Sequence, residues 1–201
     1  MTRGDPAARE PSRRDVAIAG HTGDVAMARA GLASADERVR ASALTALNRL
    51  GLLDDQDVAV ALGDTSPLVR RRACELAAHR PGVDLLPALA DADDTVVELA
   101  AFACGERGAE GAAPEVVARL ATLAVDHADA LVREAAVAAL GALEAPGGLP
   151  AILAATRDKP AIRRRAVIAL TPFEGPDVAD ALERARSDRD WQVRQAAEDL
   201  A

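Results

Sequence analysis

Arginine recurs in this chain directly after an apolar residue, and an aspartate precedes each such pair by a few residues. These pairs are Val39-Arg40, Val69-Arg70, Val132-Arg133, Ile162-Arg163 and Val193-Arg194. A guanidinium group has its N–H donors in a fixed fork, which binds a carboxylate through two parallel hydrogen bonds. Two kinds of chemistry are therefore open to these arginines: ion pairs with the chain's own aspartates, or recognition of an acidic partner.

The aspartates lie in short loops ahead of the arginines. They are Asp36, Asp64, Asp93, Asp94, Asp129, Asp158, Asp188 and Asp190. An arginine in the first turn of a helix opposes the helix macrodipole, so a nearby carboxylate is expected to offset its charge. We therefore expect a structural ladder of Asp–Arg contacts, within a repeat or between neighbouring repeats. It would use Arg40, Arg70, Arg133, Arg163 and Arg194 with Asp36, Asp64, Asp129, Asp158 and Asp190.

The spacing of these pairs predicts repeated helices. The pairs recur about every 30 residues, a period typical of solenoid proteins. Each pair is followed by an alanine four residues after the apolar member, which suits close helix crossings. In a third copy, Val97-Glu98, glutamate stands in place of the arginine, and the ladder is expected to be broken or remade there.

A shorter apolar helix is expected before each longer one, so that each repeat is a helical hairpin. We call the longer, arginine-bearing helices B helices and the shorter ones A helices. For the third A helix the expected apolar residues are Leu85, Leu86 and Leu89. One hairpin cannot bury its apolar face alone, whereas a stack of hairpins buries a continuous core.

The pattern Leu-x-Asp-x-x-x-x-Val-Arg-x-x-Ala resembles the HEAT-like repeat, in particular the short form found in phycobilin lyases. Its clearest copies start at Leu62 and at Leu131. The resemblance implies an all-α fold, an α-solenoid with a right-handed superhelix of about six two-helix repeats. We expect one solenoid domain over residues 15–201, with a disordered tail over residues 1–14. Such repeats serve as scaffolds, adaptors, lyase subunits and occasionally metal enzymes, so the resemblance alone does not give a function.

The composition agrees with closely packed helices and restricts the partners. Half of the residues are apolar, but Phe102, Phe173 and Trp191 are the only aromatic ones, which is unfavourable for a β-sandwich. The formal net charge of −8 makes nucleic acid an unfavourable partner. No apolar run is long enough to span a bilayer, and the N-terminus lacks the apolar segment of a signal peptide. With free cysteines expected at Cys74 and Cys104, we predict a cytoplasmic protein.

The remaining candidates for partner binding are two arginine clusters and one aromatic residue. Arg71 and Arg72 occupy the same repeat positions as Arg164 and Arg165, and one edge of the stack would carry both clusters. They are either available for an acidic partner or part of a solvated charged edge. An apolar row of Leu44, Cys74, Phe102, Val137 and Val167 either lines a concave groove or belongs to the core. Partner-binding candidates are therefore Arg71, Arg72, Glu98, Phe102, Arg164 and Arg165.

No residue pattern in the sequence indicates catalysis. His21, His79 and His127 lie far apart and have no ligand spacing for a metal, and glycine-rich phosphate loops are missing. We expect no cofactor, no metal and no small-molecule substrate. The predicted function is a non-catalytic scaffold or adaptor that binds another protein on the B-helix face. Alternatives are a subunit of a phycobilin-lyase-like enzyme and, less favoured, a nucleic-acid-binding helical-repeat protein.

Overall fold

The computed structural model describes residues 10–200, in which every regular element is a helix. By its internal contacts the chain divides into two compact units, one ending at Leu76 and one starting at Ala77. The expected single domain over residues 15–201 remains a prediction. Of the expected disordered tail, residues 1–9 lie outside the described part, whereas Arg13 and Arg14 already belong to the first helix.

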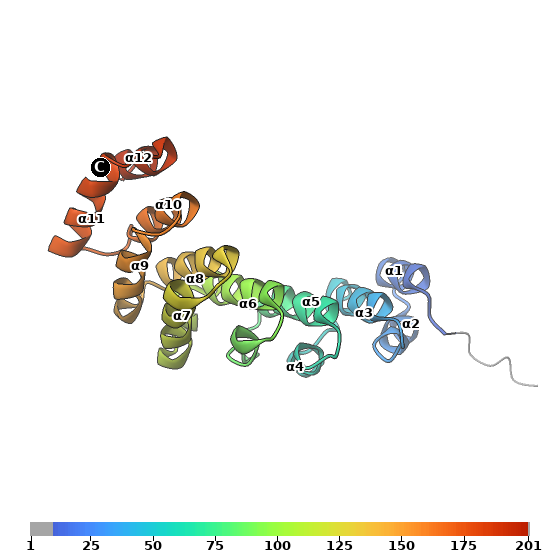
Figure 1. Cartoon of the computed structure of the whole chain (residues 1–201). Helices are drawn as coiled ribbons and strands as arrows, with labels where there is room; N and C mark the ends of the chain where they lie inside the picture. The colour runs from blue at the N-terminus through green and yellow to red at the C-terminus, as the bar shows by residue number, and fades with distance from the viewer. Residues whose placement is uncertain (1–9, 201) are drawn as a thin grey trace, which may run out of the picture. The chain divides into compact units, whose positions relative to one another are not determined.

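The first unit contains α1 (Arg13–Thr22), α2 (Val25–Gly31), α3 (Glu37–Arg49), α4 (Asp55–Leu62) and most of α5 (Pro67–Ala77). The B helices α1, α3 and α5 form one row, and the A helices α2 and α4 lie along one side of it (Figure 1). A capping box at Ser12 starts α1, and Gly23, with φ +84°, ends it.

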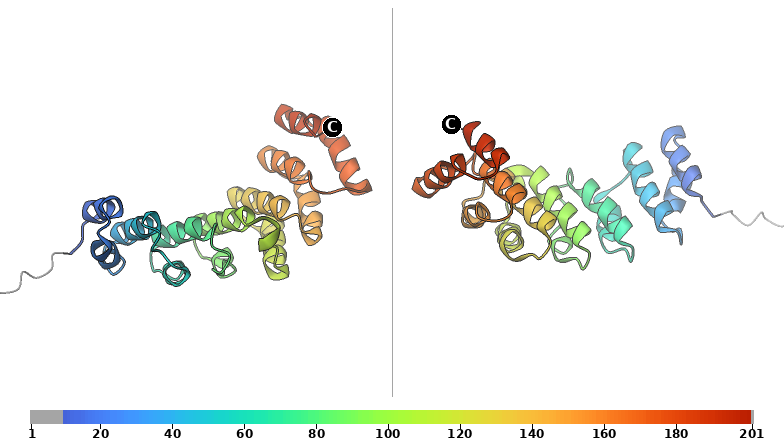
Figure 2. Two further views of the ribbon diagram at one scale, coloured as in Figure 1. Left: turned by 180° about the vertical axis from the view of Figure 1, so that it is seen from behind. Right: turned by 45° about the horizontal axis from the view of Figure 1, so that its top comes forward.

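The second unit contains the remaining helices. They are η1 (Ala88–Ala90), α6 (Asp94–Glu106), η2 (Gly108–Gly111), α7 (Pro114–Asp126), α8 (Ala130–Leu143), η3 (Pro146–Gly148), α9 (Leu149–Ala155), α10 (Pro160–Ala169), α11 (Pro176–Arg186) and α12 (Trp191–Glu198). Here α6, α8, α10 and α12 are B helices, and α7, α9 and α11 are A helices. Successive B helices of this unit pack against each other, and each A helix packs against its own B helix (Figure 2).

Aspartates fix the start of most B helices. The side chains of Asp36, Asp93, Asp129 and Asp190 each accept a hydrogen bond from the backbone N–H two residues further on. Such caps satisfy N–H groups that have no partner inside the helix, and each contributes about 1 kcal/mol. In α10 the cap position holds Lys159, and Pro160 follows as the first helical residue.

The third repeat has no α-helix at the A position. Where the apolar pattern of Leu85, Leu86 and Leu89 predicted one, the structure has only the 3-10 turn η1. Pro87 explains the difference, because a proline in a helix interior removes a hydrogen bond and clashes with the preceding turn. Leu85 and Leu89 are nevertheless buried, so this segment still covers α6 with apolar side chains.

Small residues let the B helices approach closely. The alanine at the same position of six B helices has no exposed surface in any of them. These residues are Ala43, Ala73, Ala100, Ala136, Ala166 and Ala197. In α8, a Cβ atom added at Gly141 would lie 2.7 Å from Cβ of Ala169 in α10. The alanine-rich composition thus serves helix-to-helix packing.

The capping aspartates also correct the alignment of the third repeat. Val39 and Val96 both donate their backbone N–H to the carbonyl of an aspartate cap three residues before, at 3.0 and 2.9 Å. Val96 is therefore the equivalent of Val39, and the position of the arginine is occupied by Val97, not by Glu98 as the sequence alignment assumed. Phe102 consequently does not belong to the row of Leu44 and Val137; Ala101 does.

Candidate functional site

The arginines of the B helices connect consecutive repeats. Arg133 in α8 donates to Asp158 of the following repeat from Nε at 2.7 Å and from Nη2 at 3.2 Å. Its Nη1 donates to the carbonyls of His127 and Ala128, in the loop ahead of α8. One guanidinium group thus joins its own loop to the next repeat, and only 11% of the side chain is exposed.

Arg40 and Arg163 repeat this arrangement. Arg40 donates to both carboxylate oxygens of Asp64, at 2.8 and 2.7 Å, within the first unit. Arg163 does the same with Asp188, at 2.8 and 2.7 Å, within the second. Bidentate pairs of this geometry are among the stronger charge-assisted hydrogen bonds.

Two further arginines reach the carbonyls of their own loops. Arg70 donates to the carbonyl oxygens of Asp64 and Thr65, and Arg194 donates to those of Asp188 and Arg189. In Arg40, Arg70, Arg133 and Arg194 the same Nη1 atom makes these contacts. The shared geometry indicates that these arginines order the loops ahead of the B helices.

The aspartates divide between two tasks that the sequence did not separate. Asp64 and Asp158, with Asp188, accept from the arginine of the preceding repeat. The other three expected partners cap helices instead: Asp36, Asp129 and Asp190. In the loop before α12, Arg163 therefore pairs with Asp188 and not with Asp190. The division follows from position, because the arginine partner lies one or two residues ahead of the helix cap.

The paired arginines change the ionisation of their aspartates. Hydrogen bonds from Arg40, Arg133 and Arg163 hold the pKa of Asp64, Asp158 and Asp188 below its ordinary value. Partial burial acts in the opposite direction but is the smaller cause in each case. These carboxylates are therefore ionised at neutral pH, where they form the ion pairs described above.

In the third repeat, other residues replace both the B-helix arginine and the aspartate of the following loop with which it would pair. Val97 stands at the arginine position and is buried. His127 stands at the position of Asp64 and Asp158, and its Nδ1 accepts the backbone N–H of the cap residue Asp129 at 3.1 Å. Because valine needs no carboxylate partner, the replacement leaves neither an unpaired buried guanidinium nor an unpaired carboxylate there.

A second surface lies on the outward face of the B helices, which points away from the A helices. In α6 and α8 this face borders an open cavity of about 610 Å³. Phe102 and Leu131 lie on it with 51% and 59% of their surface exposed. Its other lining includes the alanines Ala135, Ala138 and Ala142.

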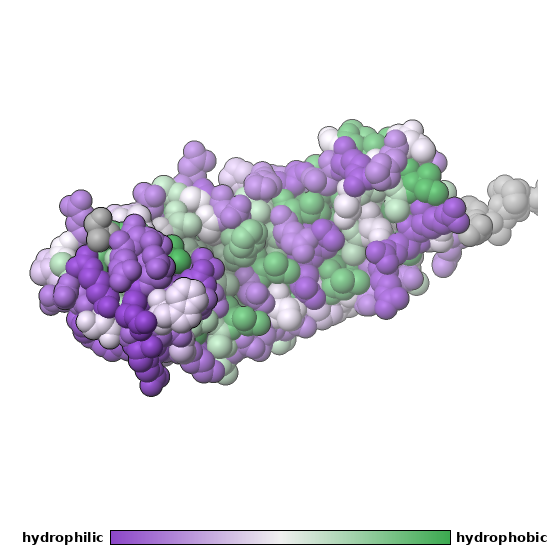
Figure 3. Space-filling view, turned by 90° about the horizontal axis from the view of Figure 1, so that it is seen from above, coloured by the Kyte–Doolittle hydropathy of each residue, from purple (hydrophilic) through white to green (hydrophobic). Residues whose placement is uncertain are grey.

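Carboxylates surround this cavity of the second unit. Glu98, Glu106 and Glu134 line it together with a single cation, Arg165, whose Nε lies 3.6 Å from Glu134. In the space-filling view, apolar side chains reach the surface in patches that hydrophilic side chains interrupt (Figure 3). An apolar patch with an acidic border is suited to bind another polypeptide.

The other partner-binding candidates border cavities of their own units. Arg71 and Arg72 border a cavity of the first unit, and Arg164 borders a shallow cavity beside Trp191 in the second. The sequence did not indicate Leu131, Arg38 or Arg49 for the outward face of their B helices. Residues two, six, nine and thirteen positions after a helix cap share it, and this spacing could have identified them.

The apolar row predicted from the sequence belongs mostly to the core. Leu44, Cys74, Val137 and Val167 are each at most 1% exposed, in contrast to Phe102. Cys74 and Cys104 are free thiols, and burial raises the pKa of Cys104 to about 11. Within residues 10–200 no group of three His, Cys, Asp or Glu side chains is placed to hold a metal ion. None of the described helices is both long and apolar enough to cross a membrane.

Solved structures with the same fold include proteins of different kinds. YibA of Escherichia coli is 18% identical, with 98% of this chain and 75% of YibA covered at a TM-score of 0.66. The complex of CpcE and CpcF of phycocyanin lyase from Nostoc sp. is 20% identical, with 98% and 79% covered at a TM-score of 0.59. A designed armadillo repeat protein in complex with the peptide (KR)4 is also 20% identical, with 88% and 97% covered at a TM-score of 0.63. At this identity the likeness shows the fold alone.

The sequence itself matches a family. No curated protein is similar enough in sequence to be matched. The family model of HEAT repeats matches residues 82–160 and residues 117–201, which together are more than half of the chain. The stacked helical hairpins and the repeated arginine–aspartate contacts extend the same repeat into the first unit. The chain belongs to the HEAT repeat family.

Proposed function

We propose that this protein is a non-catalytic interaction module, and that the outward face of α6 and α8 binds a partner protein. The observation that carries the proposal is the exposure of Phe102 and Leu131 beside a cavity lined by alanines. Large aromatic side chains at the centre of a surface patch are typical anchors of protein interfaces.

The composition of the chain supports a specific role for Phe102. The sequence contains two phenylalanines, one tryptophan and no tyrosine. Phe102 occupies the position of Ala138 in α8, so the repeat does not need an aromatic side chain there for its own core. Burial of a large apolar side chain at an interface contributes about 2 kcal/mol, which gives a partner a reason to dock there.

The acidic border of this face supports a partner with basic residues. Glu98 and Glu106 extend the surface around Phe102, and Arg165 is near Glu134. Complementary charge raises the rate of association and selects among partners. We therefore propose a partner segment that combines an apolar side chain with lysine or arginine residues.

Site-specific photo-cross-linking tests this function, and Val125 provides a matched control. Phe102 and Val125 are both 51% exposed, but Val125 lies on the A helix α7. A benzophenone amino acid introduced at Phe102 is expected to capture a discrete partner protein, and the same group at Val125 is not. The substitution Phe102→Ala is expected to abolish co-purification of that partner without lowering the midpoint of thermal unfolding.

Two outcomes would contradict the proposal. Equal capture from both positions would mean that the outward face of α6 and α8 has no special role. Turnover of a substrate by the purified chain alone would contradict the non-catalytic assignment, and a bilin is the first substrate class to try because of the predicted lyase alternative.

A further inference from the structure

The first unit carries a second outward cavity with the opposite charge. It has a volume of about 520 Å³ and is lined by residues of α1, α3 and α5. Five arginines border it: Arg13, Arg38, Arg49, Arg71 and Arg72. Glu75 is the only carboxylate among the lining residues, so this surface is strongly basic although the whole chain has a net charge of −8.

Three of these arginines have no partner in the described part of the chain. No described residue forms an ion pair or a side-chain hydrogen bond with the guanidinium groups of Arg13, Arg38 or Arg71. Arg72 differs, because it pairs with Glu75 at 2.5 Å. The cavity therefore presents several guanidinium groups that are available to a ligand.

The comparison with Arg40 shows that this availability depends on position. Arg38 and Arg40 lie two residues apart on α3, yet Arg40 donates from Nε and Nη2 to Asp64 and Arg38 does not pair. Arg40 is half-buried between repeats, whereas Arg38 is exposed on the outward face. Arg40 therefore stabilises the fold, whereas Arg38 is available to a partner.

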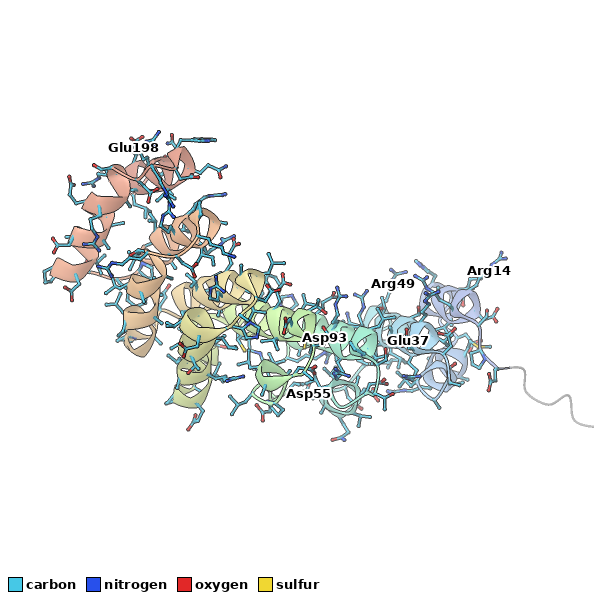
Figure 4. The ribbon with its side chains drawn as sticks, in the orientation of Figure 1. Arg14, Glu37, Arg49, Asp55, Asp93 and Glu198 are labelled. Atoms are coloured by element: carbon cyan, nitrogen blue, oxygen red, sulfur yellow. The ribbon has the colours of Figure 1, made fainter. Side chains whose placement is uncertain are left out.

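Arg49 and His21 complete the far end of the cavity. Nη1 of Arg49 contacts the ring nitrogens of His21 on α1. In Figure 4 Arg49 points away from the A helices, into the solvent above α3. An imidazole ring carries no negative charge, so the positive charge of Arg49 also remains uncompensated at this end.

We infer that this cavity binds an acidic peptide segment, one rich in aspartate and glutamate. The guanidinium fork matches a carboxylate in geometry as well as in charge. The five arginines are spread over three helices whose axes lie roughly 8–10 Å apart, so together they span ~20 Å. Several carboxylates along an extended peptide of about six residues match this spread, at ~3.3 Å per residue.

The lining of the cavity favours a peptide over a nucleic acid. Gly20, Ala17, Ala41 and Ala46 leave room for a backbone, and the lining holds no phenylalanine, tyrosine or tryptophan. Proteins that bind single-stranded nucleic acids stack bases on aromatic side chains. The single lysine and the net negative charge of the chain also weaken non-specific contacts with phosphates.

This inference is independent of the proposed function of the second unit, and fluorescence anisotropy with the full chain tests it. The probe is a fluorescein-labelled peptide of about eight residues that alternates glutamate and alanine. We expect it to bind, and we expect the same peptide with glutamine in place of glutamate not to bind. The double variant Arg38→Gln/Arg71→Gln is expected to weaken binding about tenfold or more.

A matched double variant separates the site from general charge. Arg184→Gln/Arg189→Gln removes the same charge from exposed positions outside the cavity, and it is expected to change the affinity less than about threefold. Both double variants should unfold at the same urea concentration as the parent, because none of the four side chains is buried. Phe102→Ala should leave peptide binding unchanged, so that this site and the proposed function can fail separately.

Three results would overturn the inference. They are a failure of the glutamate peptide to bind, an equal loss of affinity in both double variants, and displacement of the peptide by a short single-stranded oligonucleotide at a lower concentration than by unlabelled peptide. The last result would assign the cavity to nucleic acid.

Discussion

Arg163 donates hydrogen bonds to both carboxylate oxygens of Asp188 in the following repeat, from Nε at 2.8 Å and from Nη2 at 2.7 Å. Its Nη1 also donates to the carbonyl of Asp158, in the loop ahead of its own helix. Only 8% of the arginine side chain and 14% of the aspartate side chain are exposed. A pair this far from solvent leaves its surviving member poorly compensated when one partner is removed.

Removal of such an arginine is expected to destabilise the fold. Arg133→Ala leaves Asp158, 23% exposed, without its bidentate partner. We expect a loss of about 1–3 kcal/mol in the free energy of unfolding, measured by urea denaturation. Arg71→Ala removes an exposed side chain without a described partner, and its cost is expected to stay within about 0.5 kcal/mol.

Double-mutant cycles distinguish the two aspartates near Arg133. Asp158→Ala and Arg133→Ala should couple, because the second change removes a partner that the first has already taken away. Asp129→Ala should cost about 1 kcal/mol through the lost helix cap and should couple to Arg133→Ala more weakly than Asp158→Ala does, because Asp129 acts on Arg133 through its charge without a side-chain hydrogen bond. Equal effects of Arg133→Ala and Arg71→Ala would instead mean that Arg133 is not structural.

Most of the fold could be predicted from the sequence because the same residue pattern recurs many times along the chain. The alanine after each Val-Arg pair and the period of about 30 residues predict packed helical hairpins. The missing third A helix was not predicted, although Pro87 was visible inside its apolar pattern. The spacing of apolar residues does not show that Pro87 lacks the backbone N–H that a helix needs at this position.

The candidate sites were predicted less well, because they depend on an alignment that is uncertain by one residue. The match of Val97-Glu98 to Val-Arg placed Phe102 in one row with Leu44 and Val137, whereas the cap at Asp93 sets the alignment one residue earlier. One residue turns a helical position by about 100°, enough to move a side chain from core to solvent. The partner of Arg133 also depends on packing between repeats, which sequence distance does not reveal.

The third repeat offers a direct test of this corrected alignment. Val97→Arg alone should destabilise the protein, because it replaces a side chain that is 2% exposed with an unpaired guanidinium. His127→Asp in addition should supply the missing carboxylate and recover part of the loss. We expect a favourable coupling of about 0.5–3 kcal/mol in a double-mutant cycle followed by urea denaturation. Strict additivity of the two changes would argue against this alignment.

The ion pairs also predict how stability depends on pH. Asp64, Asp158 and Asp188 have a lower pKa in the folded protein than the ordinary value of 3.8. Their contribution to stability is therefore fully present above the unfolded-state pKa, and it is lost as the pH falls through the lower folded-state pKa.

Urea denaturation between pH 7 and pH 2.5 can measure this contribution, with Asp158→Asn as the matched variant. The variant should be less stable than the parent at pH 7, because asparagine keeps the shape but not the charge. The difference should start to shrink near pH 3.8, where Asp158 of the unfolded parent takes up a proton, and it should be lost below the lower pKa of Asp158 in the folded protein. A constant difference over the whole range would show that the charge of Asp158 does not contribute.

The close contact between α8 and α10 predicts that Gly141→Ala destabilises the protein, whereas helix propensity alone would predict that it stabilises the protein. Gly141→Ala should gain about 1 kcal/mol from helix propensity. The added Cβ, however, would lie 2.7 Å from Cβ and 2.8 Å from Cα of Ala169, and the backbone of α10 cannot yield as a flexible side chain could. We expect overpacking to exceed the gain and to destabilise the protein by about 1–2 kcal/mol net.

Gly105→Ala is the matched control for this prediction. Its added Cβ would lie 3.0 Å from Cα of Ala139, a milder approach between α6 and α8. The cost of this change should therefore be smaller, and the order of the two urea midpoints is the quantity to measure. If Gly141→Ala stabilised the protein, α8 and α10 would be able to move apart and accommodate the added methyl group. The close packing of these two helices would then not require a glycine at position 141.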